Sequence, residues 1–257
     1  MKDKRYDGVL LCTDVDGTLA DDSGKANIPQ ENIDAINYFM SKGGLFTLAT
    51  GRQKKFLTQF DGLFKVNAPI VAINGTVVIE NNKILYSHPL PENAIKDIED
   101  IIKKYPLFYE SNLRTFDDHR IYTRENGKIV MTKDAVGTYY KCIFLFDTEK
   151  ECVSFKEIME KEYGNKYQFD RSWPFELELH DKNSGKGDAI RFLRKYYGEK
   201  IKKIVCVGDY ENDISMMSEA DLSIAVANGV DTLKKVCDIQ TVSCYDNAIA
   251  KIIYDIL

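Results

Sequence analysis

Short apolar runs separated by amphipathic stretches mark the first 80 residues of the chain. Three runs are apolar at nearly every position, and they lie at residues 8–12, 45–49 and 70–73. Strands that are buried on both faces, as in a parallel sheet, show continuous runs of this kind. Between the first two runs, apolar side chains recur at helical spacing, at Ile33, Ile36, Phe39 and Met40. Pro29 before them and Gly43 after them suit the ends of a helix, so the pattern predicts a β-α-β unit.

The last third of the chain repeats this alternation of helical and strand-like patterns. Residues 189–197 predict a helix that ends at Gly198, and a second helix is expected near 214–219. Continuous apolar runs at 203–207 and 222–226 predict two further buried strands. Together with the first 80 residues, these elements predict an α/β fold built on a doubly wound parallel sheet.

The middle of the chain carries a different pattern. Asn74-Gly75 separates two apolar runs, and Asn126-Gly127 joins two strand-like segments, so each pair predicts a hairpin. From residue 175 to 180, Phe, Leu and Leu alternate with Glu, Glu and His, as expected for a sheet with one wet face. We therefore expect an α+β domain at residues 83–184, inserted into a core formed by residues 1–82 and 185–257.

Composition places the chain among ordinary globular proteins. Hydrophobic residues make up 44% and charged residues 29%, and no apolar run approaches the roughly 20 residues of a membrane span. The net charge of −5 disfavours a nucleic acid as partner, because proteins that bind phosphate backbones present a basic face. The apolar patch at residues 9–12 is too short for a signal peptide, so we expect a cytoplasmic protein. Reduced, buried cysteines are expected, since none of the six forms a C-x-x-C pair.

The sharpest candidate for chemistry is Asp14-Val15-Asp16-Gly17-Thr18, at the end of the first predicted strand. Open α/β sheets bind ligands at the ends of their strands. Two carboxylates two positions apart could act as a nucleophile and a general acid/base. An acidic turn is the competing interpretation. An EF-hand is a poor fit, because Gly17 occupies the fourth rather than the sixth position of such a loop.

Two further segments offer groups that suit a phosphate. Thr50 and Gly51 follow the second predicted strand, where a hydroxyl beside a glycine can donate to a phosphate oxygen. Lys186 stands between two glycines after Ser184, and its ammonium group suits phosphoryl oxygens. The segment around Lys186 lacks the pattern of a Walker loop. Taken alone, each segment is better interpreted as an ordinary turn or a solvated loop.

Asp209, Asn212 and Asp213 cluster directly after the strand predicted at 203–207. Oxygen ligands on such a loop suit Mg²⁺, and helix capping by Asn or Asp is the alternative. The four segments gain meaning together, because each follows a buried strand or leads into a core helix. They supply carboxylates for Mg²⁺, a nucleophile, an acid/base, a hydroxyl and a cation, which phosphoryl transfer needs.

The order of these motifs resembles that of the haloacid dehalogenase superfamily, and more narrowly that of the Cof-like hydrolases, which are Mg²⁺-dependent phosphatases. The match rests on the four segments above, on Ile73-Asn74-Gly75 and on the segment at 224–229. The resemblance implies a Rossmann-like core with a cap domain inserted between the second and third motifs, which agrees with the different pattern at 83–184. Ser184 departs slightly from the family pattern, in which a serine more often directly precedes the lysine.

The resemblance implies a role for each of these residues. Asp14 is expected to attack the phosphorus of a small phosphorylated metabolite, with Asp16 as general acid and base. Mg²⁺ would be bound by Asp14, by Asp209 and by the backbone carbonyl of Asp16. Asp213 would orient Lys186 or a water on the metal. The groups expected to hold the phosphate are those of Thr50, Gly51, Lys186 and Asn212.

The inserted domain is expected to close over the site and to select the substrate. Arg171, Trp173 and Glu178 are the candidates for this selection, because they lie on the last segments before Lys186. An ordinary surface or packing role is equally open for each of them. Sugar phosphates are the leading substrate class on family resemblance, and the sequence does not indicate an oligomeric state.

Four other classes of protein compete with a phosphatase. A phosphomutase on the same core is not excluded by any feature of the sequence. Signalling receiver domains are about half this length and lack an inserted domain. A dehalogenase is disfavoured by Asp16, since its chemistry has no phosphate leaving group to protonate. A silent binding protein is disfavoured by the intact set of Asp14, Asp16, Thr50, Lys186 and Asp209.

Overall fold

The computed structural model describes residues 4–23, 25, 27–57, 62–105 and 107–257. The chain divides into two compact units, one of Met1–Tyr86 with Gly185–Leu257 and one of Ser87–Ser184. The second unit is therefore an insertion in the first. The expected insertion began at residue 83, but β5 (Lys83–Ser87) belongs to a sheet of the first unit and keeps residues 83–86 there.

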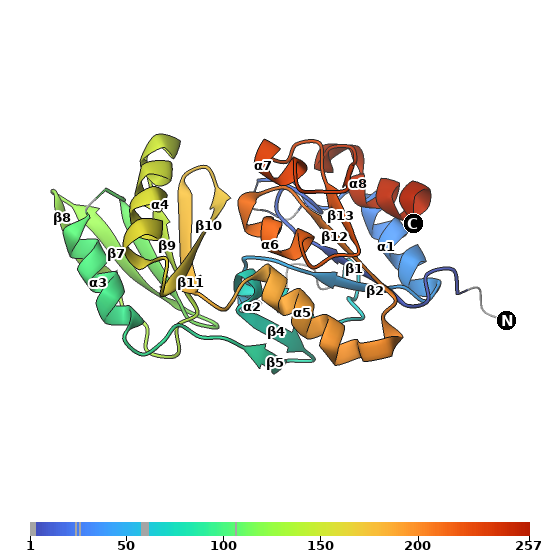
Figure 1. The fold of residues 1–257 in the computed structure, drawn as a ribbon, viewed down its shortest axis with the longest axis horizontal. Helices are drawn as coiled ribbons and strands as arrows, with labels where there is room; N and C mark the ends of the chain where they lie inside the picture. The colour runs from blue at the N-terminus through green and yellow to red at the C-terminus, as the bar shows by residue number, and fades with distance from the viewer. Residues whose placement is uncertain (1–3, 24, 26, 58–61, 106) are drawn as a thin grey trace. The chain divides into compact units, whose positions relative to one another are not determined.

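A parallel sheet forms the centre of the first unit (Figure 1). Its strands are β1 (Val9–Thr13), β2 (Leu45–Leu48), β12 (Lys203–Gly208), β13 (Leu222–Ala225) and β14 (Ile239–Gln240). They lie in the order β14-β13-β12-β1-β2, and every neighbouring pair is parallel. From β1 the chain goes to β2 on one side, and it later returns to the other side as β12. The strand order thus reverses at β1, which is the point where a doubly wound sheet binds its ligand.

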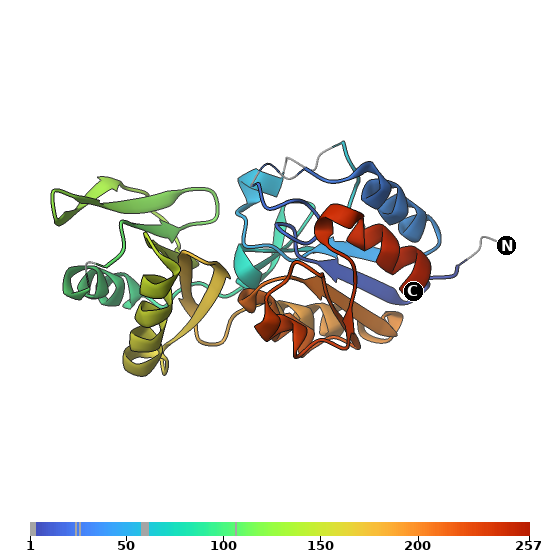
Figure 2. The same cartoon turned by 90° about the horizontal axis from the view of Figure 1, so that it is seen from above.

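Helices cover both faces of this sheet, as Figures 1 and 2 show. One face packs α1 (Gln30–Ser41) and α8 (Ala248–Lys251), which a π-helical turn extends over Ile252–Ile256. The other face packs α5 (Lys186–Tyr197), α6 (Ile214–Met217) and α7 (Asp231–Lys234). A hydrophobic core lies on each face of the sheet, and neighbouring residues of β1 point into different ones. Leu11 is buried in the same cluster as Phe39 of α1, and Leu10 in the same cluster as Ile190 of α5. The predicted doubly wound α/β fold is confirmed.

Within the described part of the chain, the third apolar run is joined to the parallel sheet by a single bridge. β3 (Ile70–Ala72) pairs antiparallel with β4 (Val77–Glu80), and β5 completes a sheet of three strands. The expected parallel pairing is reduced to a bridge between Ala49 and Val71. The predicted hairpin at Asn74-Gly75 is confirmed, and it explains the difference, because the chain turns back there. The short helix α2 (Lys54–Leu57) lies between β2 and β3.

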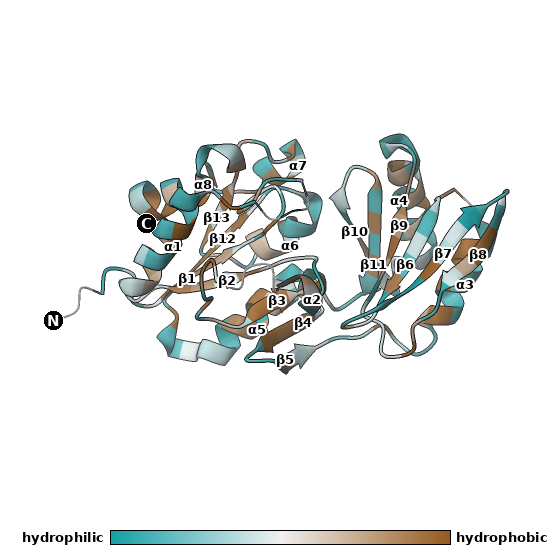
Figure 3. Cartoon of the chain, turned by 180° about the vertical axis from the view of Figure 1, so that it is seen from behind, coloured by the Kyte–Doolittle hydropathy of each residue, from teal (hydrophilic) through white to brown (hydrophobic). Residues whose placement is uncertain are grey.

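The second unit is an antiparallel sheet with two helices packed against one face. Its strands are β6 (Glu110–Arg114), β7 (His119–Glu125), β8 (Lys128–Lys133), β9 (Lys141–Leu145), β10 (Tyr167–Trp173) and β11 (Glu176–Asp181), in the order β10-β11-β9-β6-β7-β8. Helices α3 (Ala94–Lys104) and α4 (Glu149–Tyr163) share a buried cluster with Leu177 and Leu179 of β11. The alternation at 175–180 correctly places Leu177 and Leu179 on the helix-covered face, but the expected wet face is wrong here, because Glu178 and His180 are buried on the other side and form hydrogen bonds there. Figure 3 shows mixed colours on β10 and β11, whereas β12 and β13 are mainly hydrophobic.

Three smaller features bear on the expectations from sequence. All six cysteines are free and five of them are buried, as expected. His180 is fully buried, and its ring nitrogens contact Asp170 at 2.8 Å and Ser184 at 2.9 Å. Among the described residues, no helix is both long enough and apolar enough to cross a membrane.

Candidate active site

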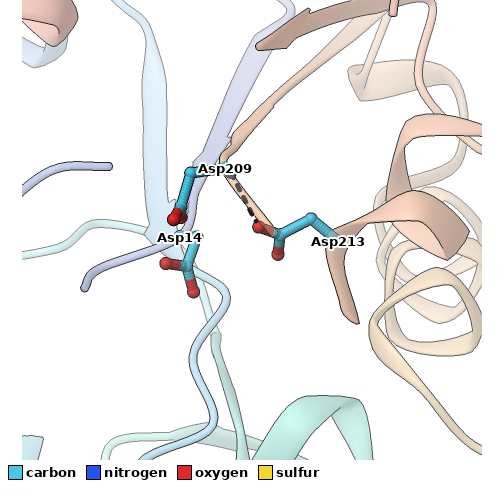
Figure 4. A group of neighbouring side chains, drawn as sticks. All are labelled: Asp14, Asp209 and Asp213. Atoms are coloured by element: carbon cyan, nitrogen blue, oxygen red, sulfur yellow. Dashed lines mark hydrogen bonds between the residues drawn. The ribbon is translucent and has the colours of Figure 1, made fainter. Parts of the chain in front are cut away.

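Three aspartates meet at the carboxyl ends of β1 and β12, where the strand order reverses (Figure 4). Asp14 directly follows β1, Asp209 directly follows β12, and Asp213 ends the 3-10 turn Glu211–Asp213. Oxygens of the three carboxylates lie within 4.8 Å of one another. Asp14 is 7%, Asp209 9% and Asp213 0% exposed, so water screens their mutual repulsion only weakly.

Lys186 supplies a positive charge to this cluster. It is the first residue of α5 and is buried, and its Nζ donates to Asp14 Oδ1 at 2.5 Å and to Asp213 Oδ1 at 2.6 Å. Burial raises the pKa of Asp14 to about 7, against the charge of Lys186 and with the charges of Asp213 and Asp16. Burial and the neighbouring carboxylates also raise the pKa of Asp209 well above its usual range. A cation between these groups would favour their ionised forms.

Both carboxylate oxygens of Asp213 accept hydrogen bonds from the protein. Oδ1 accepts from Lys186, and Oδ2 accepts from the backbone N–H groups of Asp209 at 3.0 Å and Tyr210 at 3.3 Å. These bonds orient the ammonium group and shape the loop that carries Asp209. The arrangement matches a supporting residue better than a metal ligand.

Asp209 is held by the loop that follows Asp14 in the sequence. The Thr18 hydroxyl donates to Asp209 Oδ1 at 2.7 Å. Gly17 has a φ of +80°, and a Cβ there would lie 2.6 Å from Asp209 Oδ2, so any other residue would be strained and would displace the Asp209 carboxylate. Asn228 fixes the same loop by donating from Nδ2 to Gly17 O at 2.7 Å. Thr18 and Asn228 lie in the motifs at residues 14–18 and 224–229, but their hydrogen-bond partners become visible only in the folded chain.

The loop after β2 lies beside the loop that carries Asp14. The backbone N–H of Ala49 donates to Thr13 O at 2.8 Å. This bond brings Thr50, which is buried, and Gly51, which is half-buried, to the edge of the sheet that carries Asp14. The predicted phosphate-binding pair therefore follows the strand next to the candidate nucleophile.

Asn74 connects this loop to the loop that follows β12. Its backbone N–H donates to Thr50 O at 2.9 Å, and its Oδ1 accepts from Asn212 Nδ2 at 3.2 Å. Ile73 and Asn74 have φ values of 50° and 52°, a conformation that is strained for a β-branched residue such as isoleucine. Backbone strain of this kind is typical of a functional site. From the sequence, this turn was predicted only as a hairpin and as part of a family motif.

Asp16 is bound by Arg52, a pairing that no pattern in the sequence indicated. Arg52 Nε donates to Asp16 Oδ2 at 2.8 Å, and Nη2 donates to Oδ1 at 2.5 Å. The side chain of Asp16 is 37% exposed and that of Arg52 is 12% exposed. Asp16 is thus held at the solvent side of the cluster by a cation other than Lys186.

The three candidates for substrate selection lie in different surroundings within the second unit. Arg171 Nη2 contacts Glu149 Oε1 of α4 at 2.5 Å, on the face of the sheet that packs the helices. Glu178 is buried and accepts from Lys141 Nζ at 2.6 Å and from the Ser172 hydroxyl at 2.7 Å. Trp173 is 41% exposed and follows an irregularity in the pairing of β10 with β11. The structure therefore does not join these three residues in one cluster.

Comparison with known proteins agrees with this arrangement. A family model described as haloacid dehalogenase-like hydrolase matches residues 11–253. The chain is 24% identical to the phosphoglycolate phosphatase of Sulfurisphaera tokodaii, over 90% of this chain and 86% of that protein. It is 26% identical to the chloroplastic endoribonuclease YBEY of Arabidopsis thaliana, over 95% of this chain but 46% of that protein, so it spans about half of that relative. The structure of the HAD subclass IIB sugar phosphatase BT4131 matches with a TM-score of 0.77 at 20% identity, over 94% of this chain and 96% of that one.

Proposed function

Because the chain belongs to the haloacid dehalogenase-like hydrolase family, we propose that it is an Mg²⁺-dependent phosphatase of small phosphomonoesters. The observation that carries this proposal is the contact of Lys186 with both Asp14 and Asp213, beside Asp209. The relatives named as a phosphoglycolate phosphatase and a sugar phosphatase support the reaction class. We place sugar phosphates first among the substrates to test. We also propose a cytoplasmic location, because free cysteines are typical of a reducing compartment.

The donor set at the site fits Mg²⁺, because it consists of hard oxygen ligands with a net negative charge. Asp14 and Asp209 would bind the ion with their carboxylates, and Asp16 with its backbone carbonyl. When bound, the ion would neutralise charge on the phosphoryl group during its transfer. Thr18 would keep Asp209 in position for this role through its bond of 2.7 Å.

In the first step, a carboxylate oxygen of Asp14 attacks the phosphorus in line with the ester oxygen. The bond between phosphorus and the ester oxygen breaks, and Asp16 gives its proton to that oxygen, so the leaving group departs as a neutral alcohol. Asp14 then carries the phosphoryl group as an aspartyl-phosphate. The groups proposed to hold the phosphoryl oxygens are those of Thr50, Gly51, Lys186 and Asn212.

In the second step, Asp16 accepts a proton from the water that attacks the phosphorus. The bond between phosphorus and Asp14 breaks, inorganic phosphate leaves, and both aspartates return to their starting forms. The surroundings of the two carboxylates suit this division of roles. Asp14 is 7% exposed and lies against Lys186, whereas the Asp16 side chain is 37% exposed and can exchange protons with water.

We propose that the second unit, Ser87–Ser184, acts as the cap that excludes water and selects the substrate. Trp173 offers an exposed aromatic ring for this purpose. Glu178, which is buried and held by Lys141 and Ser172, would act through the packing of its sheet rather than by touching the substrate. Arg171, which is bound to Glu149, would act through the packing of α4 rather than by touching the substrate.

The proposal is tested by phosphate release from a panel of phosphomonoesters that includes sugar phosphates and an aryl phosphate, with and without Mg²⁺. Turnover should require Mg²⁺, and Asp14→Asn should lower it by at least about 10²–10⁴-fold. Asp34→Asn, at an exposed position of α1, serves as the matched control and should leave turnover unchanged. If Asp14→Asn keeps a tenth of the wild-type rate, Asp14 is not the nucleophile. Isomerisation of a sugar phosphate without phosphate release would identify a phosphomutase instead.

A further inference from the structure

The charges of the candidate site divide into two groups with separate cations. Lys186 contacts Asp14 and Asp213 through hydrogen bonds of 2.5 Å and 2.6 Å. Arg52 contacts Asp16 through two bonds, of 2.8 Å from Nε and 2.5 Å from Nη2. Arg52 therefore neutralises one of the carboxylates to which Lys186 does not donate.

The contact between Arg52 and Asp16 is bidentate, so it fixes the orientation of the Asp16 carboxylate as well as its distance from Arg52. A guanidinium fork that donates to both oxygens of a carboxylate sets the plane of that group as well as its position. A lysine at the same place could supply the charge without setting the plane. Asp16 would otherwise turn freely, because its side chain is 37% exposed and a short side chain at the solvent edge has several accessible rotamers.

Hydrogen bonds hold both the backbone N–H and the backbone carbonyl of Arg52. Its N–H donates to the Thr50 hydroxyl at 3.1 Å, and its carbonyl accepts from the Ile73 N–H at 3.1 Å. Ile73 lies in the strained turn with positive φ that packs against this loop. Strain of this kind persists only where the surroundings hold it, so the rigid turn gives Arg52 a fixed base from which to reach Asp16.

We propose that Arg52 is a positioning residue for the reaction, which holds the Asp16 carboxyl group in the orientation that serves the leaving oxygen and keeps it apart from Asp14. This inference rests on the proposed phosphatase function. It assigns no contact between Arg52 and the phosphate.

The leaving group of the substrate provides the test. An alkyl phosphate needs a proton on its departing oxygen, whereas p-nitrophenyl phosphate releases a stable anion and needs little help from an acid. Arg52→Gln should therefore lower kcat for glucose 6-phosphate by roughly 10–10²-fold and kcat for p-nitrophenyl phosphate by less than about threefold. Inhibition by inorganic phosphate should keep its constant, because the phosphate site is intact. Arg52→Lys should restore part of the loss.

A double variant separates positioning from a structural effect. Arg52→Gln added to Asp16→Asn should cause no further loss on glucose 6-phosphate, since residues that act as a unit are not additive. Arg191→Gln removes another ion-paired arginine of the first unit and is the matched control. Should Arg52→Gln fail to fold, the same two-ester comparison with Arg52→Lys decides the question.

Each remaining outcome overturns a specific claim. Equal losses on the two esters, a weaker inhibition by phosphate, or additive losses in the double variant would show that Arg52 binds phosphate or supports the fold instead. A wild-type chain that turns over neither these esters nor any member of the panel would overturn the proposed function and this inference with it. Wild-type turnover with equal losses in the variant would overturn the inference alone.

Discussion

The ammonium group of Lys186 lies 2.5 Å from Asp14 Oδ1, although 172 positions separate the two residues in the chain. The whole second unit, Ser87–Ser184, lies between them in sequence. Their contact joins the end of β1 to the start of α5 and completes the buried charge cluster with Asp213. Several measurable properties of the protein depend on this contact and on the loops around it.

Replacing Lys186 by glutamine should weaken both the fold and the activity. The change leaves Asp14 and Asp213 buried without their cation, which costs about 3–5 kcal/mol when one partner of a buried pair is removed. Mg²⁺ should restore part of this stability, because it brings positive charge to the same carboxylates. Thermal unfolding with and without Mg²⁺ measures both effects. Lys195→Gln, at an exposed position of the same helix, should change neither, and an unaltered melting temperature in Lys186→Gln would contradict the prediction.

Thr18→Val should weaken Mg²⁺ binding and also cost about 1–3 kcal/mol of stability, because a buried hydrogen bond to a carboxylate is lost. The variant removes the donor to Asp209 Oδ1, and the loss of such a partner behind a ligand typically costs about 10–10²-fold in metal affinity. Titration calorimetry with Mg²⁺ gives the affinity directly. Thr123→Val removes a hydroxyl contact to Thr132 in the second unit and is the control. Equal affinities in the two variants would show that Thr18 does not support a metal ligand.

Gly17→Ala should abolish Mg²⁺-dependent turnover, and Gly127→Ala should not. Both glycines have positive φ, +80° and +75°, so each substitution carries a strain of about 1–2 kcal/mol. Only at Gly17 does the new Cβ meet Asp209, at 2.6 Å from Oδ2, whereas Gly127 has open space around it. Activity and unfolding of the two variants are compared side by side. Similar activity in both would mean that Asp209 tolerates the displacement.

His180→Gln should destabilise the second unit mainly in weakly acidic solution. Its contact with Asp170 holds the pKa of His180 above and that of Asp170 below the usual value, against the burial that acts on each group. The stability that ionised Asp170 contributes is lost as the pH falls through the lowered pKa of Asp170. The His180 contribution is complete below the unfolded value of about 6.5 and is lost as the pH rises through its raised pKa.

The loss in free energy of unfolding caused by His180→Gln should therefore be largest near pH 5.5, at about 3 kcal/mol. It should be smaller at pH 9, because a neutral ring in the wild type still donates one hydrogen bond. Urea unfolding at the two pH values measures it. Asp170→Asn in the His180→Gln background should add little, because the first change already removes the ion pair. A loss that is the same at both pH values would show that the contact stabilises the fold without its charge.

The sequence by itself determined the buried strands of the core, the presence of a second unit with a different pattern, and the segments that hold the candidate site. Continuous apolar runs predicted β1, β2 and β12, and the alternation at 175–180 predicted which side of β11 packs against the helices, although its other side is buried rather than wet. These features depend on neighbours a few positions away, because burial on one or both faces of an element leaves a short period in the sequence. The acidic motif at residues 14–18 was visible for the same reason, since it directly follows such a run.

The tertiary structure decided which side chains meet. Arg52 reaches Asp16, Asn74 meets Asn212, and Lys186 lies between Asp14 and Asp213, over separations in sequence that no local pattern encodes. In the second unit, strand register places Glu178 opposite Asp170 and Leu177 opposite Arg171. Arg171 and Glu178 therefore lie on different faces of their sheet, although both had been grouped as candidates. Contacts of this kind follow from strand order, register and loop packing, which only the folded chain establishes.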